Sequence, residues 1–252
     1  MTLLSVILSN IAIMARPALF NLYFAGAAIP VGFVFAIFIA LGKNSTNMLL
    51  NRLSRAYIYF FRGSPFFIQL FAFYSLTLAF NESLWKPLGL DAFILHPLFL
   101  GPAILALNTT AYTAEIFYGA LITVPKGEVE AARAYGMTRR QRFWSVTWPN
   151  LIRLAWPAYT NEVVFLFQAT ALVYFTLPVI GDQRDLMSMA GELFQKDYNV
   201  FLHFGMAAAY FLVISLVIFY ALGLIYRRLM RHLPQQARVK FTVAEISRSF
   251  RC

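Results

Sequence analysis

Five long apolar stretches restrict the fold of this chain more than any other feature of its sequence. A helix rises about 1.5 Å per residue and the hydrocarbon core of a bilayer is about 30 Å thick, so about 20 apolar residues suffice for one crossing. The stretches cover residues 18–41, 63–80, 97–124, 154–181 and 198–226. They predict an all-α membrane protein with five transmembrane helices.

The composition agrees with a membrane protein. Hydrophobic residues make up 60% of the chain and charged residues 13%, compared with about 25% charged residues in soluble domains. Residues 1–252 are therefore expected to form a single transmembrane domain. The segment before residue 18 is apolar but lacks a basic start and a small-residue cleavage site, so we expect a short leading or interfacial helix there and no cleaved signal.

Basic residues are distributed unevenly among the connections between the predicted spans. Most of the 21 lysines and arginines lie in residues 42–62, residues 125–153 and the C-terminal tail. The opposite side carries Arg16, Lys86, Arg184 and Lys196. Since cytoplasmic connections are rich in Lys and Arg, the N-terminus is predicted outside and the C-terminus in the cytoplasm. The net charge of +10 is thus explained by the orientation of the chain in the membrane, where lipid is the expected partner. No nucleic-acid partner is expected.

The sequence offers little for catalysis or metal binding. The only cysteine is Cys252, and the three histidines are too far apart in sequence to suggest a metal site. A phosphate-binding loop ends in Gly-Lys followed by Ser or Thr, but Asn44 follows the one near match, at residues 42–43. We therefore expect a chain with no catalytic residues, no metal and no cofactor of its own, and so not an enzyme.

The segment at residues 125–153 is charged and rich in helix-forming residues, although it lies between two apolar stretches. Gly136 is placed to end a first helix, and Thr138 to cap a second that runs through Trp148 and stops at Pro149. Small alanines in the first helix would let another protein approach closely. An amphipathic hairpin resting on the membrane fits the same residues, so the physical pattern leaves both interpretations open.

Specific motifs in this segment and in the spans resemble one protein family. Glu130-Ala131-Ala132, Gly136 and the run Val146-Thr147-Trp148-Pro149 resemble the EAA signature of permease subunits of bacterial ATP-binding cassette (ABC) importers. Val146 and Trp148 replace the usual Ile and Leu of that signature. The sequences FRGSPFFIQLFAFY, LNTTAYTAEIFYGAL and PAYTNEVVFLFQATAL are similar to those of polar amino acid permeases of the histidine, lysine/arginine and opine branch.

The resemblance implies a type I ABC importer permease fold in the bacterial inner membrane. It also implies that residues 125–153 form a cytoplasmic coupling segment docking on an ATP-binding subunit, which carries ATP and Mg²⁺. Other implied partners are a second, related permease chain in a heterodimer and a periplasmic substrate-binding protein. The docking residues would be Glu130, Ala131, Ala132, Arg133, Gly136 and Pro149. Such a permease would form the path for histidine, basic amino acids or opine-like compounds.

Polar residues within the spans are candidates for that path. A charge in a membrane span costs at least about 2.5 kcal/mol, so the two span carboxylates, Glu115 and Glu162, should face protein or water. Helical spacing places Glu115 on the same helix face as Asn108 and Tyr112. On the fourth predicted span, it places Asn161, Phe165 and Gln168 on one face. These two faces could meet across a gap and hold a zwitterion or a cation. The candidate path residues are Asn108, Tyr112, Glu115, Glu162 and Gln168.

Less specific roles are also compatible with these residues. Glu115 could pair with an arginine, Glu162 could reach water near the end of its span, and the amide and phenol groups could join helices by hydrogen bonds. Two other kinds of protein remain possible on physical grounds. One is a stand-alone transporter driven by protons, with Glu115 as the proton site, and the other is a membrane scaffold without transport activity.

Overall fold

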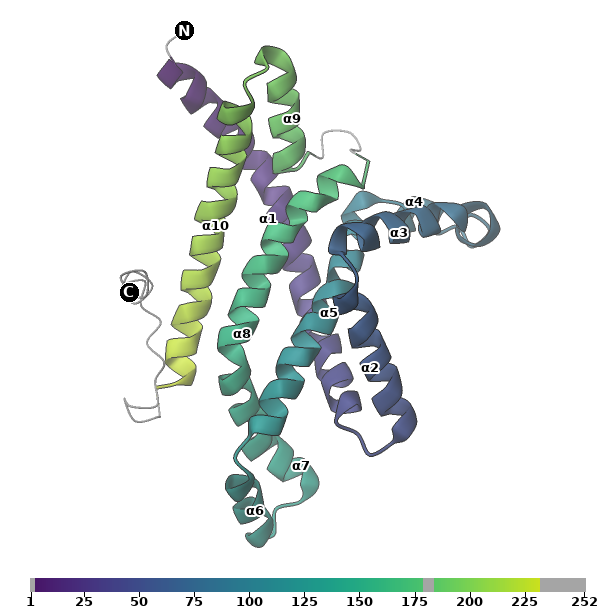
Figure 1. Cartoon of the computed structure of the whole chain (residues 1–252), viewed down its shortest axis with the longest axis vertical. Coiled ribbons are helices and arrows are strands. Elements are labelled where there is room, and N and C mark those ends of the chain that lie inside the picture. Colours follow the sequence, from purple (N-terminus) through teal and green to yellow (C-terminus); the bar gives the residue numbers. More distant parts are fainter. Residues whose placement is uncertain (1–2, 179–183, 232–252) are drawn as a thin grey trace.

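The computed structural model describes residues 3–178 and 184–231, with side chains from residue 10 onward, and every regular element in these ranges is helical. Long helices run side by side along the molecule, and a short arm projects from them (Figure 1). The longer helices are α1 (Leu3–Lys43), α2 (Met48–Gly63), α3 (Phe66–Ala79), α5 (Pro97–Thr123), α8 (Trp148–Ala169), α9 (Leu186–Asp197) and α10 (Val200–Leu229). The shorter elements are η1 (Asn81–Trp85), α4 (Asp91–Ile94), α6 (Lys126–Ala134), α7 (Arg139–Arg142), η2 (Phe143–Thr147) and η3 (Thr170–Phe175).

Helix α1 joins two segments that the sequence suggested were separate. The expected leading helix is instead the first part of one helix that continues through the first predicted span to Lys43. The internal prolines Pro17 and Pro30 do not end it, as is common for helices packed in lipid. Its main neighbour is α5, which it approaches closely at Gly32, where an added Cβ would lie only 2.4 Å from Thr109 Cγ2.

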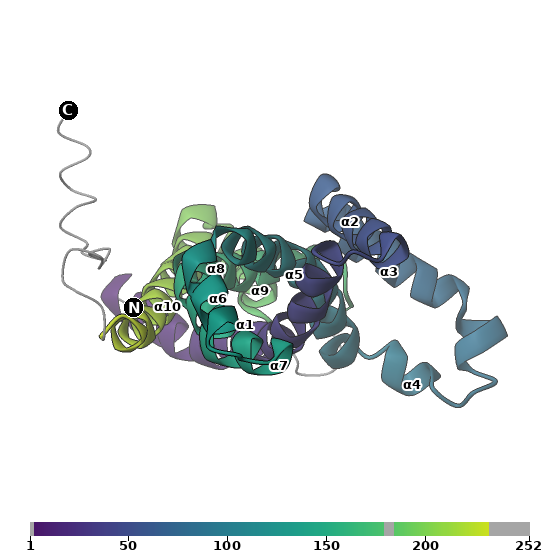
Figure 2. The same ribbon diagram turned by 90° about the horizontal axis from the view of Figure 1, so that it is seen from below.

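Residues 42–62, expected as a loop, contain most of the additional helix α2. Asn47 caps this helix by accepting a hydrogen bond from the Leu49 N–H at 2.9 Å. Helix α2 packs against α1 and α5, and it ends at an elbow where Ser64 is extended before Pro65. Helix α3 begins only after that proline and has 14 residues, so it rises about 21 Å and is shorter than a hydrocarbon core. Helices α3 and α4 project from the other helices in both views (Figures 1 and 2).

The helices differ in how well they would cross a membrane alone. Among the described residues, Asn10–Lys43 and Val200–Leu229 are long and apolar enough by length and composition. Helices α5 and α8 occupy most of the third and fourth predicted spans but contain more polar groups. The last residues of the fourth predicted span, 179–181, and the tail beyond residue 231 lie outside the described residues.

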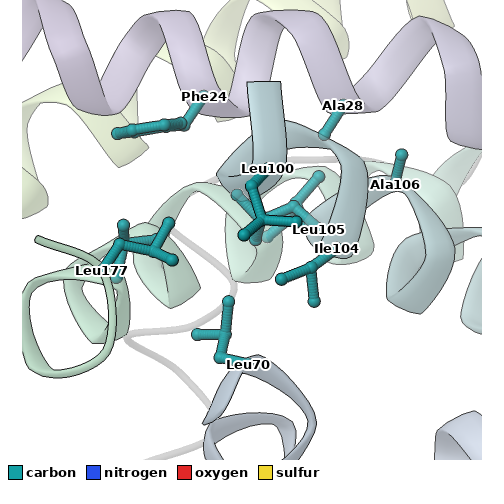
Figure 3. Packing of buried hydrophobic residues seen from close by; sticks show 10 residues of the cluster. Phe24, Ala28, Leu70, Leu100, Ile104, Leu105, Ala106 and Leu177 are labelled. Atoms are coloured by element: carbon teal, nitrogen blue, oxygen red, sulfur yellow. The ribbon is translucent and has the colours of Figure 1, made fainter. Parts of the chain in front are cut away.

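The largest apolar cluster joins α1, α3, α5, α8 and the segment after it. Figure 3 shows side chains from these elements converging around α5. Its buried members include Phe24, Ala28, Leu70, Leu105 and Leu177. A second cluster packs α1, α2, α5 and α8 nearer the end of α1, and a third packs the start of α1 against α9 and α10. Helix α1 therefore links both ends of the molecule.

The connection before α10 contains the short helix α9. Helix α9 is capped by Asp185, which accepts the Ser188 N–H at 2.8 Å. Fully buried Asn21 joins three elements, because its Nδ2 donates to Thr170 Oγ1 and its Oδ1 accepts the Leu186 N–H, both at 3.0 Å. This amide holds α9 against α1.

Candidate functional site

Residues 125–153, the predicted coupling segment, form a hairpin where α5 ends and α8 begins, away from the projecting arm (Figure 1). Helix α6 ends in a turn that favours glycine, because Gly136 has a φ of +76°. The Gly136 N–H donates to the Arg133 carbonyl at 2.9 Å, and the Met137 N–H donates to the Ala132 carbonyl at 3.1 Å. These two bonds are those of a Schellman motif. The prediction that Gly136 ends the first helix is confirmed.

The second half of the hairpin begins as predicted and ends differently. Thr138 and Gln141 form a capping box, in which the Gln141 N–H donates to Thr138 Oγ1 at 3.3 Å and the Thr138 N–H donates to Gln141 Oε1 at 3.0 Å. Helix α7 then passes through the π-helical turn η2 directly into α8. The predicted stop at Pro149 is wrong, because this proline lies in the first turn of α8, where its missing N–H costs no helical hydrogen bond.

Some side chains of the hairpin pack against the protein, and others are exposed. Ala132 is buried, and the Glu128 carboxylate accepts a hydrogen bond from Asn150 Nδ2, which ties α6 to the start of α8. The opposite side presents Glu130, Ala131 and Arg133 to the exterior. Tyr135 is 87% exposed beside them, although nothing in the sequence pattern pointed to it except its place directly before Gly136. A surface of small, charged and aromatic side chains is therefore available to a partner.

Glu115 forms the centre of a charged cluster where α1, α2 and α5 meet. Its carboxylate pairs with Lys43 Nζ and lies 3.9 Å from Arg62 Nη1. Each cation also sits over a tyrosine ring of α5: Lys43 lies 4.2 Å from the Tyr118 centroid, and Arg62 lies 5.3 Å from the Tyr112 centroid. The structure therefore places Glu115 in the ion pair that was one of its two possible roles.

This charged cluster lines an open cleft of 570 Å³. Two of the predicted path residues, Tyr112 and Glu115, contribute to the wall of the cleft, and its cations are Lys43, Arg55 and Arg62. The cleft could receive a small polar molecule with an anionic group, because its cations outnumber its one carboxylate.

Asn108 lies deeper and holds the elbow between α2 and α3. Its Nδ2 donates to Gln69 Oε1 at 2.8 Å, and both side chains are buried. Gln69 Nε2 donates in turn to the carbonyls of Phe61 at 2.7 Å and Ser64 at 2.9 Å. The elbow that carries Arg62 is thus fixed to α5 through two amides, and Gln69 was not recognised from the sequence as part of this arrangement.

The remaining predicted path residues lie on α8. Buried Glu162 accepts a hydrogen bond from Thr109 Oγ1 of α5 at 3.0 Å, and Gln168 Nε2 donates to Ser215 Oγ of α10 at 3.4 Å. The predicted face of Asn161, Phe165 and Gln168 is exposed, so the two polar faces do not meet within the part of the chain that the structure describes. That part also contains no group of three His, Cys, Asp or Glu side chains suited to a metal ion.

Comparisons with known proteins agree with this geometry. The family model described as "Binding-protein-dependent transport system inner membrane component" matches residues 28–238. The chain is 38% identical over 192 residues to the histidine/lysine/arginine/ornithine transport system permease protein HisM of Escherichia coli strain K12, covering 76% of this chain and 78% of HisM. It is 34% identical over 188 residues to the nopaline transport system permease protein NocM of Agrobacterium fabrum, covering 75% of this chain and 76% of NocM.

Two solved structures share the fold. A crystal structure of an amino acid ABC transporter with histidines matches with a TM-score of 0.71 and 27% identity, covering 90% of this chain and 99% of that one. An inward-facing structure of the MetNI methionine ABC transporter matches with a TM-score of 0.66 at 18% identity, covering 86% and 95%. The second likeness concerns the fold alone. The helical arrangement described above is therefore that of a type I importer permease.

Proposed function

This chain belongs to the family of binding-protein-dependent transport system inner membrane components, and we propose that it forms a membrane path for histidine, basic amino acids or opine-like compounds. As a member it is a non-catalytic permease subunit of an ABC importer, which works with a separate ATP-binding subunit and a substrate-binding protein. The relatives favour this function over a stand-alone proton-coupled transporter. ATP and Mg²⁺ are assigned in this proposal to the ATP-binding subunit.

The observation that carries the substrate class is the contrast between the two span carboxylates. Glu115 is neutralised by Lys43 and Arg62, whereas the direct partner of buried Glu162 is the Thr109 hydroxyl. In the described residues Glu162 forms no ion pair, and Arg62 acts on its charge only from beyond ion-pair distance. Its burial is therefore costly, and a substrate with a cationic side chain would offset that cost. Relatives named for histidine, lysine, arginine, ornithine, nopaline and octopine transport support the same class of substrate.

The proposal also includes the topology and the assembly. The apolar stretches favour five crossings, and the charge distribution favours an outside N-terminus and a cytoplasmic C-terminus. We assign the second crossing to α2 and α3 together because α3 alone is short. The exposed face of Asn161, Phe165 and Gln168 supports a path completed by a second, related permease chain. The hairpin surface of Glu130, Ala131 and Arg133 would dock on the ATP-binding subunit.

Uptake by the reconstituted complex tests the substrate class. Proteoliposomes containing the whole importer and its binding protein would be supplied with labelled arginine, histidine, octopine or glutamine. We expect ATP-dependent uptake of arginine, histidine and octopine, whose side chains carry a guanidinium or a protonatable imidazole, and Glu162→Gln should reduce it at least about tenfold because that group loses its partner. Glu82→Gln, which makes the same change at an exposed carboxylate outside the predicted path, is the matched control. Equal uptake of glutamine, or full uptake by the Glu162→Gln complex, would contradict the assignment.

A further inference from the structure

A second groove lies between α1, α2 and α5 and has no wall in common with the charged cleft. Its volume is 560 Å³, and it opens to the outside of the helices, where Val31 is 47% and Phe35 57% exposed. Residues from α5 and Tyr57 of α2 form the opposite wall. The α1 wall consists of every fourth residue along one helix face: Tyr23, Ala27, Val31, Phe35 and Ile39.

The dimensions of the groove fit a thin, extended occupant. The wall from Tyr23 to Ile39 is about 24 Å long at the helical rise per residue. Over that length, a volume of 560 Å³ corresponds to a cross-section of about 20 Å², which is that of one hydrocarbon chain. A helix with a diameter of 10–12 Å would need about 80 Å² or more. The bottom of the groove therefore admits one extended chain, whereas a helix of a second protein chain could lie only over its open side.

The surface of the groove is chemically apolar although hydroxyl groups line it. The hydroxyls of Tyr23, Tyr57 and Thr110 donate to backbone carbonyls of α5 at 3.0, 2.7 and 2.6 Å. Since these donors are already satisfied, a polar molecule in the groove would lose its hydrogen bonds to water without replacement. An aliphatic chain suffers no such loss.

One end of the groove adjoins a basic site at the depth of the lipid headgroups. A neighbouring pocket shares Tyr23 and Leu98 with the groove and also contains Arg16, and a further pocket is lined by both Arg16 and Arg184. Arg184 forms an ion pair with Glu192, so the headgroup contact is assigned to Arg16. Arg16 and Lys43 are about 40 Å apart along α1, which matches the roughly 40–45 Å thickness of a bilayer with its headgroups. Arginine at that level attracts anionic headgroups.

We propose that this groove binds one anionic phospholipid, with an acyl chain between α1 and α5 and the phosphate beside Arg16. The lipid would fill the space between α1 and α5 that runs from Tyr23 toward Ile39. It would thereby support the packing of α1 against α5. The site is separate from the transport path, and it holds whether or not the proposed substrate class is correct.

Native mass spectrometry of the whole complex tests this site. Complexes would be released from nanodiscs of phosphatidylglycerol and phosphatidylcholine, and the lipids retained per copy of this chain counted. Ala103→Trp or Val31→Trp, which fill the groove, should lower retention at least about tenfold by removing buried apolar contact. Arg16→Gln should lower the preference for phosphatidylglycerol about fivefold. The control Leu212→Trp, at an exposed position of α10, should retain lipid as the wild type does.

Three results would overturn the proposal. The first is lipid retention by both groove-filling variants equal to that of the wild type. The second is an unchanged headgroup preference in the Arg16→Gln complex. The third is efficient cross-linking of a Phe35→Cys variant to another permease chain in the membrane, which would show that protein rather than lipid covers the groove.

Discussion

The turn at Gly136 provides a quantitative test of the coupling hairpin. A Cβ added there would have no heavy atom within 4 Å, so the cost of Gly136→Val arises from the positive φ of +76° and not from a clash. Left-handed backbone costs about 1–2 kcal/mol for an L-residue, which lowers the equilibrium constant for the native turn about 5- to 30-fold. If the hairpin transmits conformational change, ATP hydrolysis stimulated by the substrate-loaded binding protein should fall, by at most that factor.

Two further variants separate this effect from a general disturbance of the hairpin. Gly136→Asn should retain most of the activity, since Asn tolerates the left-handed region. Gly127→Ala lies within α6, also has open space around the added Cβ, and should stabilise the helix by about 0.5–1 kcal/mol. The assay would measure ATP hydrolysis in nanodiscs and the amount of assembled complex. Wild-type stimulation with Gly136→Val, or an equal loss with Gly127→Ala, would refute the reasoning.

Three predictions concern stability, each measured by thermal unfolding of the purified complex. Gly32→Leu should destabilise the contact of α1 with α5 by about 1–3 kcal/mol, whereas Gly26→Leu, which has open space, should not; equal losses would disprove the close approach. Lys43→Gln and Glu115→Gln should each lower the free energy of unfolding by about 1–3 kcal/mol, and the double variant should lose less than the sum of the two single losses. A double variant that loses the full sum would rule out a direct pair. The backbone N–H of Asn199 donates to the Asp197 carboxylate and, with other hydrogen bonds, lowers its pKa from 3.8. The stabilisation from this carboxylate should therefore be complete above pH 3.8 and be lost as the pH falls below it, whereas Asp197→Asn should lack this loss. Identical unfolding profiles of the wild type and Asp197→Asn in acid would contradict this.

Local signals in the sequence predicted the features that depend on local chemistry. The apolar stretches located the long helices, and Gly136 and Thr138 marked the turn and the cap of the hairpin because both act through neighbouring backbone groups. Pro149 was misjudged because proline is compatible with the first turn of a helix as well as with its end.

Features that depend on tertiary contact were not predictable in the same way. The charged stretch before residue 62 was taken for a loop, although its apolar face makes it a helix once α1 and α5 are present. The pairing of Lys43 with Glu115, and of Gln69 with Asn108, joins residues far apart in sequence. Helical spacing placed Glu115 on a face of its helix but could not identify which cation would meet it.

We propose that a separate ATP-binding subunit drives this chain through the hairpin between α5 and α8. The most direct measurement is purification of the tagged chain from its native membrane, followed by identification of the co-purifying proteins and assay of ATP hydrolysis. The account predicts an ATP-binding subunit in the complex and ATP hydrolysis that the substrate-loaded binding protein stimulates. A chain that purifies alone and still accumulates substrate in proteoliposomes under a proton gradient would contradict it.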